Sequence, residues 1–135
     1  MAECKSCAIE IRVPYYDVDQ MGCVHHSNYL RYFELGRTEL LRQTGWAYRD
    51  LEESGVFFVV AKASCTFHLP ARYDELLVVT TTIKRVTLVR IDHAYELRRK
   101  DDDVLLASGQ TTLACVDRQG QIIPMPEGLN RKKRA

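Results

Sequence analysis

The second half of the chain alternates apolar and polar residues with a period of two. The alternation runs through residues 56–69, 76–86, 90–99 and 104–116. Short turn-like stretches at residues 71–75, 87–89 and 100–103 separate these segments. A period of two is typical of strands that bury one face and expose the other. In the third segment, one face carries Ile91, His93, Tyr95 and Leu97. The pattern therefore predicts four successive antiparallel strands joined by hairpins.

The first half of the chain begins with one more strand and then changes to a helical period. Residues 9–15 alternate, and Pro14 indicates that this strand ends there or lies at a sheet edge. Residues 28–43 follow helical spacing. The apolar face of this helix is expected to consist of Leu30, Phe33, Leu40 and Leu41. One strand, one long helix and four further strands predict an α+β domain whose helix covers one side of the sheet.

The ends of this helix carry recognisable signals. Ser27 or Asn28 can supply the N-cap, and Gly45 is suited to a C-terminal stop. Gly36 inside the helix costs roughly 1 kcal/mol relative to alanine, so we expect either close backbone packing or room for a ligand there. Residues 46–54 predict a short second helix or a turn.

Length and composition are those of one globular domain. The chain has 135 residues, of which 46% are hydrophobic, and this is enough for a single core. We expect one domain over residues 1–135, with its core at 8–128 and a basic tail at 129–135. Nineteen basic and eighteen acidic residues give a net charge of +1, which favours neither nucleic acid nor membrane insertion. The basic run 131–134 is interpreted as a solvated tail, with phosphate contact as the alternative.

The cysteines and the start of the chain favour the cytoplasm. No apolar leader is visible, and the longest apolar run, residues 56–61, is too short to span a bilayer. Five cysteines, an odd number, then indicate free thiols in a reducing compartment. Cys4 and Cys7 form a C-x-x-C without two further ligands, so we expect incidental thiols there. Cys65 and Cys115 lie in strand patterns and are expected in the core.

Ionisable side chains concentrate just before the long helix. Asp17 and Asp19 stand two residues apart, Gly22 follows, and His25 and His26 precede the helix start. Carboxylates and histidines at a helix N-terminus can carry out proton transfer or nucleophilic chemistry beside an anion site. Two alternatives remain open, because the carboxylates can simply bond nearby backbone amides, and the four side chains can also bind a metal ion. The spacing is not that of a firm metal motif, so no metal is expected.

The same region carries a family resemblance. The motif runs through Arg12, Val13, Asp19, Gly22, Val24, His26 and Tyr29, continues at residues 32–34 and 36–39, and returns at Phe67 and 70–74. In these residues the chain resembles the hotdog-fold thioesterases, in particular the 4-hydroxybenzoyl-CoA thioesterase and YbgC-like acyl-CoA thioesterase family. The resemblance implies a hotdog fold, in which a long helix packs on a five- to six-stranded antiparallel sheet. Val18 and Cys23 depart from the family pattern, but the acid, the glycine and the histidine are in place.

The resemblance also implies roles for individual residues. Asp19 would be the catalytic carboxylate, which either attacks the thioester carbonyl or activates the attacking water. His26 would orient water or bond to the thioester, and backbone N–H groups near His26 to Asn28 would stabilise the oxyanion. Gly22 would let the loop turn sharply, and Tyr15 would support Asp19.

Two further sets of residues are weaker candidates. Glu34 is the reserve catalytic residue, because another branch of hotdog thioesterases uses a helix carboxylate; its alternative role is an ion pair with Arg37. Coenzyme A carries several phosphates, so cations are expected at the mouth of the pocket. The candidate cations are Lys84, Arg85 and Arg90, which flank one hairpin, and Arg72, which flanks another. The family's basic cluster near the first of these hairpins is not matched residue by residue.

The resemblance implies an acyl-CoA thioesterase that needs no cofactor, since coenzyme A is part of the substrate. It also implies a homodimer or homotetramer whose active site lies at the subunit interface. Two other readings stay open. One is a dehydratase or hydratase of the same fold, although those enzymes carry a different Asp/His motif. The other is a non-catalytic binding module for acyl-CoA or an acyl carrier, against which the retained Asp19, Gly22 and His26 argue.

Overall fold

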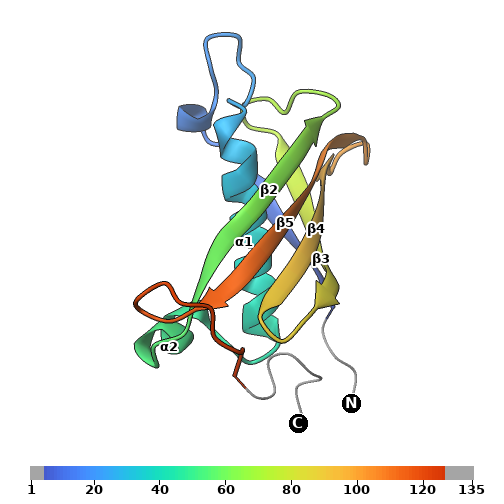
Figure 1. Cartoon of the computed structure of the whole chain (residues 1–135). Helices are drawn as coiled ribbons and strands as arrows, with labels where there is room; N and C mark the ends of the chain where they lie inside the picture. The colour runs from blue at the N-terminus through green and yellow to red at the C-terminus, as the bar shows by residue number, and fades with distance from the viewer. Residues whose placement is uncertain (1–4, 127–135) are drawn as a thin grey trace.

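A computed structural model of the chain describes residues 5–126. In it, a five-stranded antiparallel sheet curves around one long helix (Figure 1). The elements are β1 (Ser6–Arg12), the 3-10 turn η1 (Tyr15–Asp17), α1 (Ser27–Gln43), α2 (Tyr48–Glu53), β2 (Phe57–Phe67), β3 (Leu76–Val86), β4 (Arg90–Arg99) and β5 (Leu105–Val116). The strand order is β1-β3-β4-β5-β2, so β1 and β2 form the two edges. The predicted α+β architecture is confirmed with five strands, and beyond β5 one isolated bridge joins Ile122 to Val116.

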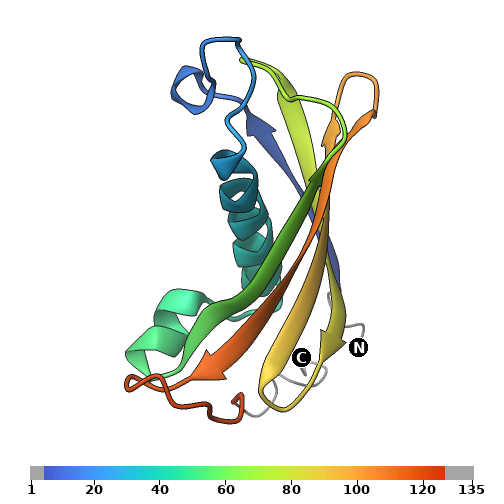
Figure 2. The same cartoon turned by 45° about the horizontal axis from the view of Figure 1, so that its top comes forward.

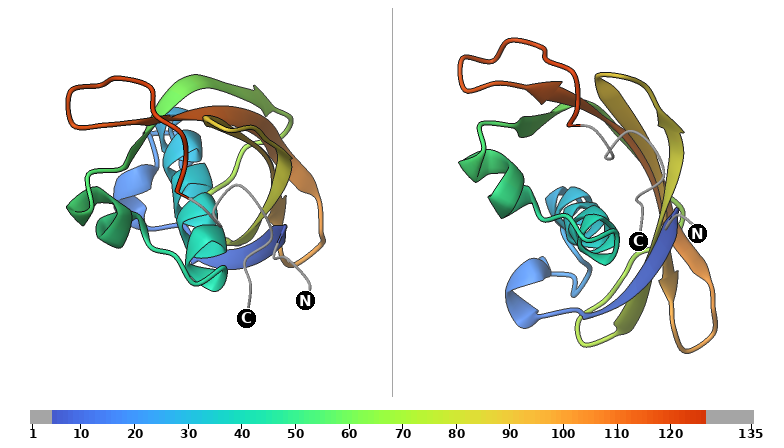
Figure 3. Two further views of the ribbon diagram at one scale, coloured as in Figure 1. Left: turned by 60° about the horizontal axis from the view of Figure 1, so that its bottom comes forward. Right: turned by 90° about the horizontal axis from the view of Figure 1, so that it is seen from below.

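The core lies between α1 and the concave face of the sheet (Figures 2 and 3). Phe33 is fully buried and stacks on Tyr95 of β4, with ring centroids 4.5 Å apart. The expected inward position of Leu30 was wrong, because its side chain is 42% exposed. Tyr29 and Tyr32 are buried in its place. With 3.6 residues per turn, the two tyrosines continue the face of Phe33 toward the helix start, and they displace the leucine to its margin.

The strand predicted over residues 9–15 ends earlier, at Arg12. Pro14 has no N–H group for a strand ladder, and it opens the η1 turn, in which the Asp17 N–H group donates to the Pro14 carbonyl at 3.1 Å. The turn directs Asp17 inward, where it is 5% exposed. Pro14 therefore separates the sheet from the segment that carries the candidate chemistry.

Gly36 lies where the backbone of α1 packs closely against β3. A Cβ atom at this position would overlap the hydroxyl oxygen of Thr81 on β3 and lie 3.0 Å from a methyl group of Val79. Close backbone packing, the first of the two expectations for Gly36, explains the glycine.

Gly36→Ala is expected to destabilise the protein by about 1–3 kcal/mol, because the added methyl group must push α1 away from β3. Urea unfolding measures the change. Thr81→Ala removes the overlapping hydroxyl, so the double variant should recover part of the loss. If the changes in the free energy of unfolding caused by the two substitutions simply add, the proposed overlap is contradicted.

Polar side chains are also buried beneath α1. His93 on β4 and Thr111 on β5 lie in this layer, and the Tyr95 hydroxyl is 2.6 Å from the Thr111 hydroxyl. An Arg37 Nη1 atom of α1 donates to the Tyr95 hydroxyl at 3.5 Å. Burial, followed by the nearby Arg37 charge, lowers the pKa of His93 to about 4, while Asp92 acts in the opposite direction. His93 is therefore neutral in the folded protein at neutral pH.

Acid is expected to destabilise the protein as the pH falls from 6.5 to 4. The ordinary pKa of 6.5 applies to His93 in the unfolded chain and about 4 in the folded one, so the unfolded state takes up the proton first. At pH 4, the protonation of His93 is expected to lower the free energy of unfolding by roughly 3 kcal/mol. Urea unfolding of wild type and His93→Gln across these pH values measures it. An identical pH dependence in both proteins would assign the effect to other groups.

Candidate functional site

The segment from Asp17 to His25 forms a tight antiparallel hairpin. The His25 N–H group donates to the Asp17 carbonyl at 2.9 Å, and the Asp19 N–H group donates to the Cys23 carbonyl at 2.8 Å. Val18 and Val24 pair between these two bonds. The hairpin lies at the end of the molecule where α1 begins, next to the connection between β2 and β3 (Figures 1 and 2). The sequence predicted a loop here, and the structure shows an ordered turn with its own ladder.

Asp19 lies at the closed end of this hairpin and is exposed. Its Oδ1 atom accepts hydrogen bonds from the N–H groups of Met21 at 2.8 Å and Cys23 at 3.2 Å. Within residues 5–126, Oδ2 takes part in no hydrogen bond. Gly22 has a φ of +79° and donates to the Asp19 carbonyl at 3.0 Å, which confirms the expected sharp turn. The carboxylate is therefore held through one oxygen and presents the other.

The start of α1 departs from the predicted cap. The residue at the N-cap position is His26, not Ser27 or Asn28. The His25 Nδ1 atom accepts the Ser27 N–H group at 3.2 Å, and the His25 carbonyl accepts the Asn28 N–H group at 2.9 Å. The ring of His26 is exposed and packs on His25, with centroids 4.2 Å apart. Of the N–H groups expected to stabilise an oxyanion, that of His26 alone has no acceptor in the described part of the chain.

Asn28 is buried and connects the helix to the hairpin. Its Nδ2 atom donates to the Asp17 carbonyl at 2.9 Å. Tyr32, one turn along α1, donates from its hydroxyl to Oδ2 of Asp17 at 2.7 Å. Burial, followed by the bond to this carboxylate, raises the pKa of Tyr32. Asn28 and Tyr32 thus both bond to Asp17, one through its carbonyl and the other through its carboxylate, a grouping that the sequence did not single out.

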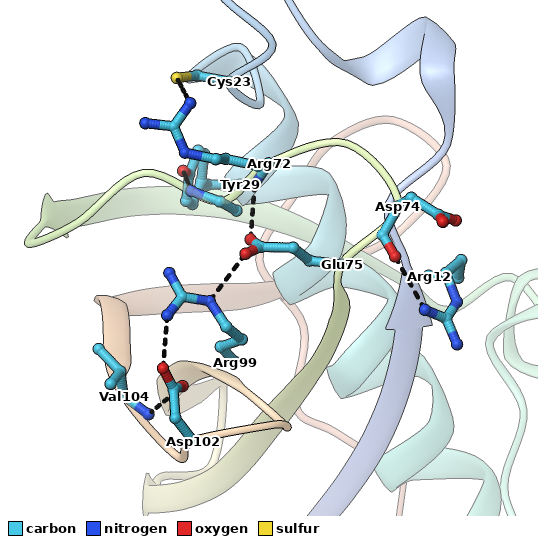
Figure 4. Close-up of polar contacts among 10 residues, drawn as sticks. Arg12, Cys23, Tyr29, Arg72, Asp74, Glu75, Arg99, Asp102 and Val104 are labelled. Carbon is cyan, nitrogen blue, oxygen red and sulfur yellow. Dashed lines mark hydrogen bonds and ion pairs between the residues drawn. The ribbon is translucent and has the colours of Figure 1, made fainter.

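The β2–β3 connection holds the opposite side of the hairpin (Figure 4). The Val24 N–H group donates to the Ala71 carbonyl at 2.8 Å, and the Tyr73 N–H group donates to the Gly22 carbonyl at 3.2 Å. The Arg72 guanidinium reaches Sγ of Cys23 at 3.5 Å. Arg72 is the candidate cation that the fold brings to the Asp19 hairpin.

Glu75 ties this connection to the turn between β4 and β5 (Figure 4). Its Oε1 atom accepts the Arg72 N–H group at 2.8 Å, and its Oε2 atom pairs with Arg99 at 2.9 Å. Arg99 in turn pairs with Asp102 at 2.7 Å. These contacts hold the backbone at Arg72. The pair between Glu75 and Arg99 joins residues far apart in the chain, so no sequence motif indicated it.

The remaining candidates lie apart from Asp19. Tyr15 is 76% exposed, and its ring packs edge-on against Tyr73 at 5.5 Å. Within residues 5–126 its side chain makes no hydrogen bond to Asp19. Glu34 is exposed, and the ion pair expected between it and Arg37 is absent from residues 5–126. The three other candidate cations lie around the β3–β4 hairpin, at the opposite end of the sheet from Asp19 (Figure 1): Lys84, Arg85 and Arg90.

Among residues 5–126, no three histidine, cysteine or acidic side chains gather closely enough to hold a metal ion. No helix in the same range is long and apolar enough to cross a membrane. Cys115 is buried as expected and Cys65 is half-buried, whereas Cys4 and the basic run 131–134 lie outside the described residues.

Comparison with known proteins identifies the family and the fold. The sequence pattern of the thioesterase-like superfamily matches residues 13–132. The acyl-CoA thioesterase YbgC of Haemophilus influenzae is 35% identical over 108 residues, covering 79% of this chain and 78% of that protein. The putative acyl-CoA thioesterase YneP of Bacillus subtilis is 33% identical over 110 residues, covering 82% and 79%. The structure of the hypothetical protein TT1821 from Thermus thermophilus has a TM-score of 0.87 and 35% identity over 93% of each chain.

Fold and matches together define a hotdog-fold protein of the thioester hydrolase class, as the resemblance implied. The chain belongs to the thioesterase-like superfamily.

Proposed function

We propose that this protein hydrolyses acyl-CoA thioesters to the free acid and coenzyme A, with Asp19 as general base or nucleophile. The observation that carries the proposal is that the Asp19 carboxylate is held through one oxygen on the hairpin that leads into the start of α1. Asp19 is bound through Oδ1 alone, and the N–H group of His26 has no acceptor in the described chain. The curated relatives named as acyl-CoA thioesterases support the choice of substrate.

The chemistry needs two groups, and the site supplies both. In the base mechanism, Oδ2 of Asp19 takes a proton from water as that water attacks the thioester carbonyl. The C–S bond then breaks, and the leaving thiolate takes up the proton from Asp19. In the nucleophilic mechanism, Oδ2 attacks the carbonyl itself, the thiolate leaves, and water then hydrolyses the resulting anhydride. In either case the carbonyl oxygen becomes an oxyanion, which the His26 N–H group would stabilise at the positive end of α1.

Asp19→Asn is expected to lower kcat by about 10²- to 10⁴-fold, because the carboxamide can neither accept the proton nor attack the thioester. The carboxamide oxygen can still accept the hydrogen bonds of Met21 and Cys23, so the fold should persist. The measurement is free-thiol release across short, long and aromatic acyl-CoA substrates, with circular dichroism as the check on folding.

Asp50→Asn is the matched control, because Asp50 is an exposed acid on α2 whose carboxylate pairs with Arg49 at 3.9 Å. It should turn over normally. Near-normal turnover by folded Asp19→Asn would refute the role of Asp19 and direct attention to Glu34. Binding of acyl-CoA by the wild type without thiol release would instead support the binding-module alternative.

We also propose that two copies join through β2 and complete the acyl pocket between them. β2 pairs with β5 along one side, and its other side is an open edge in the described chain. Val59 and Val60 lie exposed on this edge, as does Phe67 near its end. A long open edge with exposed apolar residues is usually paired or covered. Phe67 packs against Tyr29 at 4.9 Å, so the edge leads directly to the first turn of α1.

Val60→Lys is expected to shift the protein toward monomer and to reduce activity with it, because a charge on an open edge opposes strand pairing. Light scattering across protein concentration, run beside the hydrolysis assay, measures both. Leu88→Lys is the control, since Leu88 is an exposed leucine in the β3–β4 turn, away from the edge. A fully active monomer would contradict a pocket shared between chains.

A further inference from the structure

Asp17 is a buried carboxylate in a segment whose chemistry is assigned to a different residue. Its side chain is 6% exposed, and one of its oxygens, Oδ1, has no hydrogen bond. Arg31 approaches this oxygen to 3.8 Å, but the Arg31 side chain is 67% exposed and solvent weakens the pair. A buried carboxylate with only one direct hydrogen bond costs free energy. Stability alone therefore gives no reason for this residue.

Three contacts of Asp17 set the geometry of the hairpin. Its carbonyl accepts the His25 N–H group of the opposite hairpin strand and Nδ2 of Asn28 on α1, both at 2.9 Å. Its Oδ2 atom accepts the Tyr32 hydroxyl at 2.7 Å. One residue thus fixes the stem of the hairpin to two successive turns of the helix.

Asp17 cannot itself meet a substrate, because the protein covers its carboxylate and Tyr32 occupies the one bonded oxygen. Asp19 is two residues beyond Asp17 on the same hairpin strand. On the opposite strand, the His25 N–H group donates to the Asp17 carbonyl, and the His26 N–H group is one residue further on. The two groups that the chemistry requires therefore extend from either side of a stem that Asp17 anchors.

We infer that Asp17 is a positioning residue, which together with Tyr32 sets the Asp19 carboxylate relative to the start of α1. The inference rests on the proposed function, since positioning matters to turnover only if Asp19 carries out the chemistry. The two neighbouring carboxylates then have distinct roles. Asp17 holds the hairpin in place, and Asp19 reacts with the substrate.

Asp17→Ala is expected to lower kcat by on the order of 10- to 100-fold with little change in KM, because a small displacement of a reacting group is costly. Tyr32→Phe removes the same hydrogen bond from the helix side and should behave alike. Asp17→Asn keeps an acceptor for the Tyr32 hydroxyl and should recover most of the activity. If Asp17→Ala does not fold, Tyr32→Phe carries the test.

A double-mutant cycle separates positioning from general support of the fold. In the Asp19→Asn background, Asp17→Ala should change the residual rate less than about 2-fold, because there is no longer a carboxylate to position. The same fold-loss in both backgrounds would overturn the inference. Lower stability with an unchanged kcat per folded molecule would overturn it as well.

Amide hydrogen exchange gives a readout that does not depend on any substrate. The N–H groups of Cys23 and His25 should exchange at least several-fold faster in Asp17→Ala than in wild type, while those of β4 keep their rates. Unchanged exchange in the hairpin would refute the anchoring role, whatever the enzyme hydrolyses. Faster exchange combined with full activity in Asp19→Asn would instead confirm the anchor and refute the proposed role of Asp19.

Discussion

The sheet has one concave apolar face, and α1 is the element that covers its centre. Phe33 fills the interior against Tyr95, and Gly36 allows the helix backbone to approach Thr81 of β3. This contact fixes how deeply the helix lies in the curve of the sheet and therefore where its first turn stands. Everything at the candidate site is arranged around that first turn, because the hairpin, the β2–β3 connection and the β2 edge all meet it.

At the candidate site, the hairpin from Asp17 to His25 is held both by α1 and by the β2–β3 connection. Asn28 and Tyr32 hold the hairpin from the helix, and the backbone around Ala71 holds it from the sheet. Between them Asp19 keeps one oxygen uncommitted. A carboxylate whose orientation is set in advance loses little freedom when the substrate binds, and preorganisation of this kind is what acyl-transfer chemistry gains from a protein. The cost appears at Asp17, whose buried carboxylate is incompletely paired.

Much of this could be predicted from the sequence. The period of two located β3 and β4 to the residue, and Gly45 ended α1 where expected, with a φ of +93°. Patterns failed where the decisive partner is remote. Leu30 looked inward on apolarity alone, but burial there went to tyrosines whose hydroxyl groups have partners on the hairpin and the connection. Likewise, the ion pair between Glu75 and Arg99 joins residues far apart in the chain, for which the sequence has no local signal. The cap formed by His25 is local, since its Nδ1 atom accepts the Ser27 N–H group two residues on, but the expected caps were Ser27 and Asn28.

The central claim is that the thioester is bound between Asp19 and the start of α1. A crystal structure of Asp19→Asn with a bound acyl-CoA measures this most directly, because the substituted side chain keeps its shape but spares the substrate. The account predicts the thioester carbonyl oxygen within hydrogen-bond distance of the His26 N–H group, and the carbonyl carbon about 3–3.5 Å from the side chain at position 19. A thioester bound beside Glu34, or against the outer face of the sheet, would contradict it.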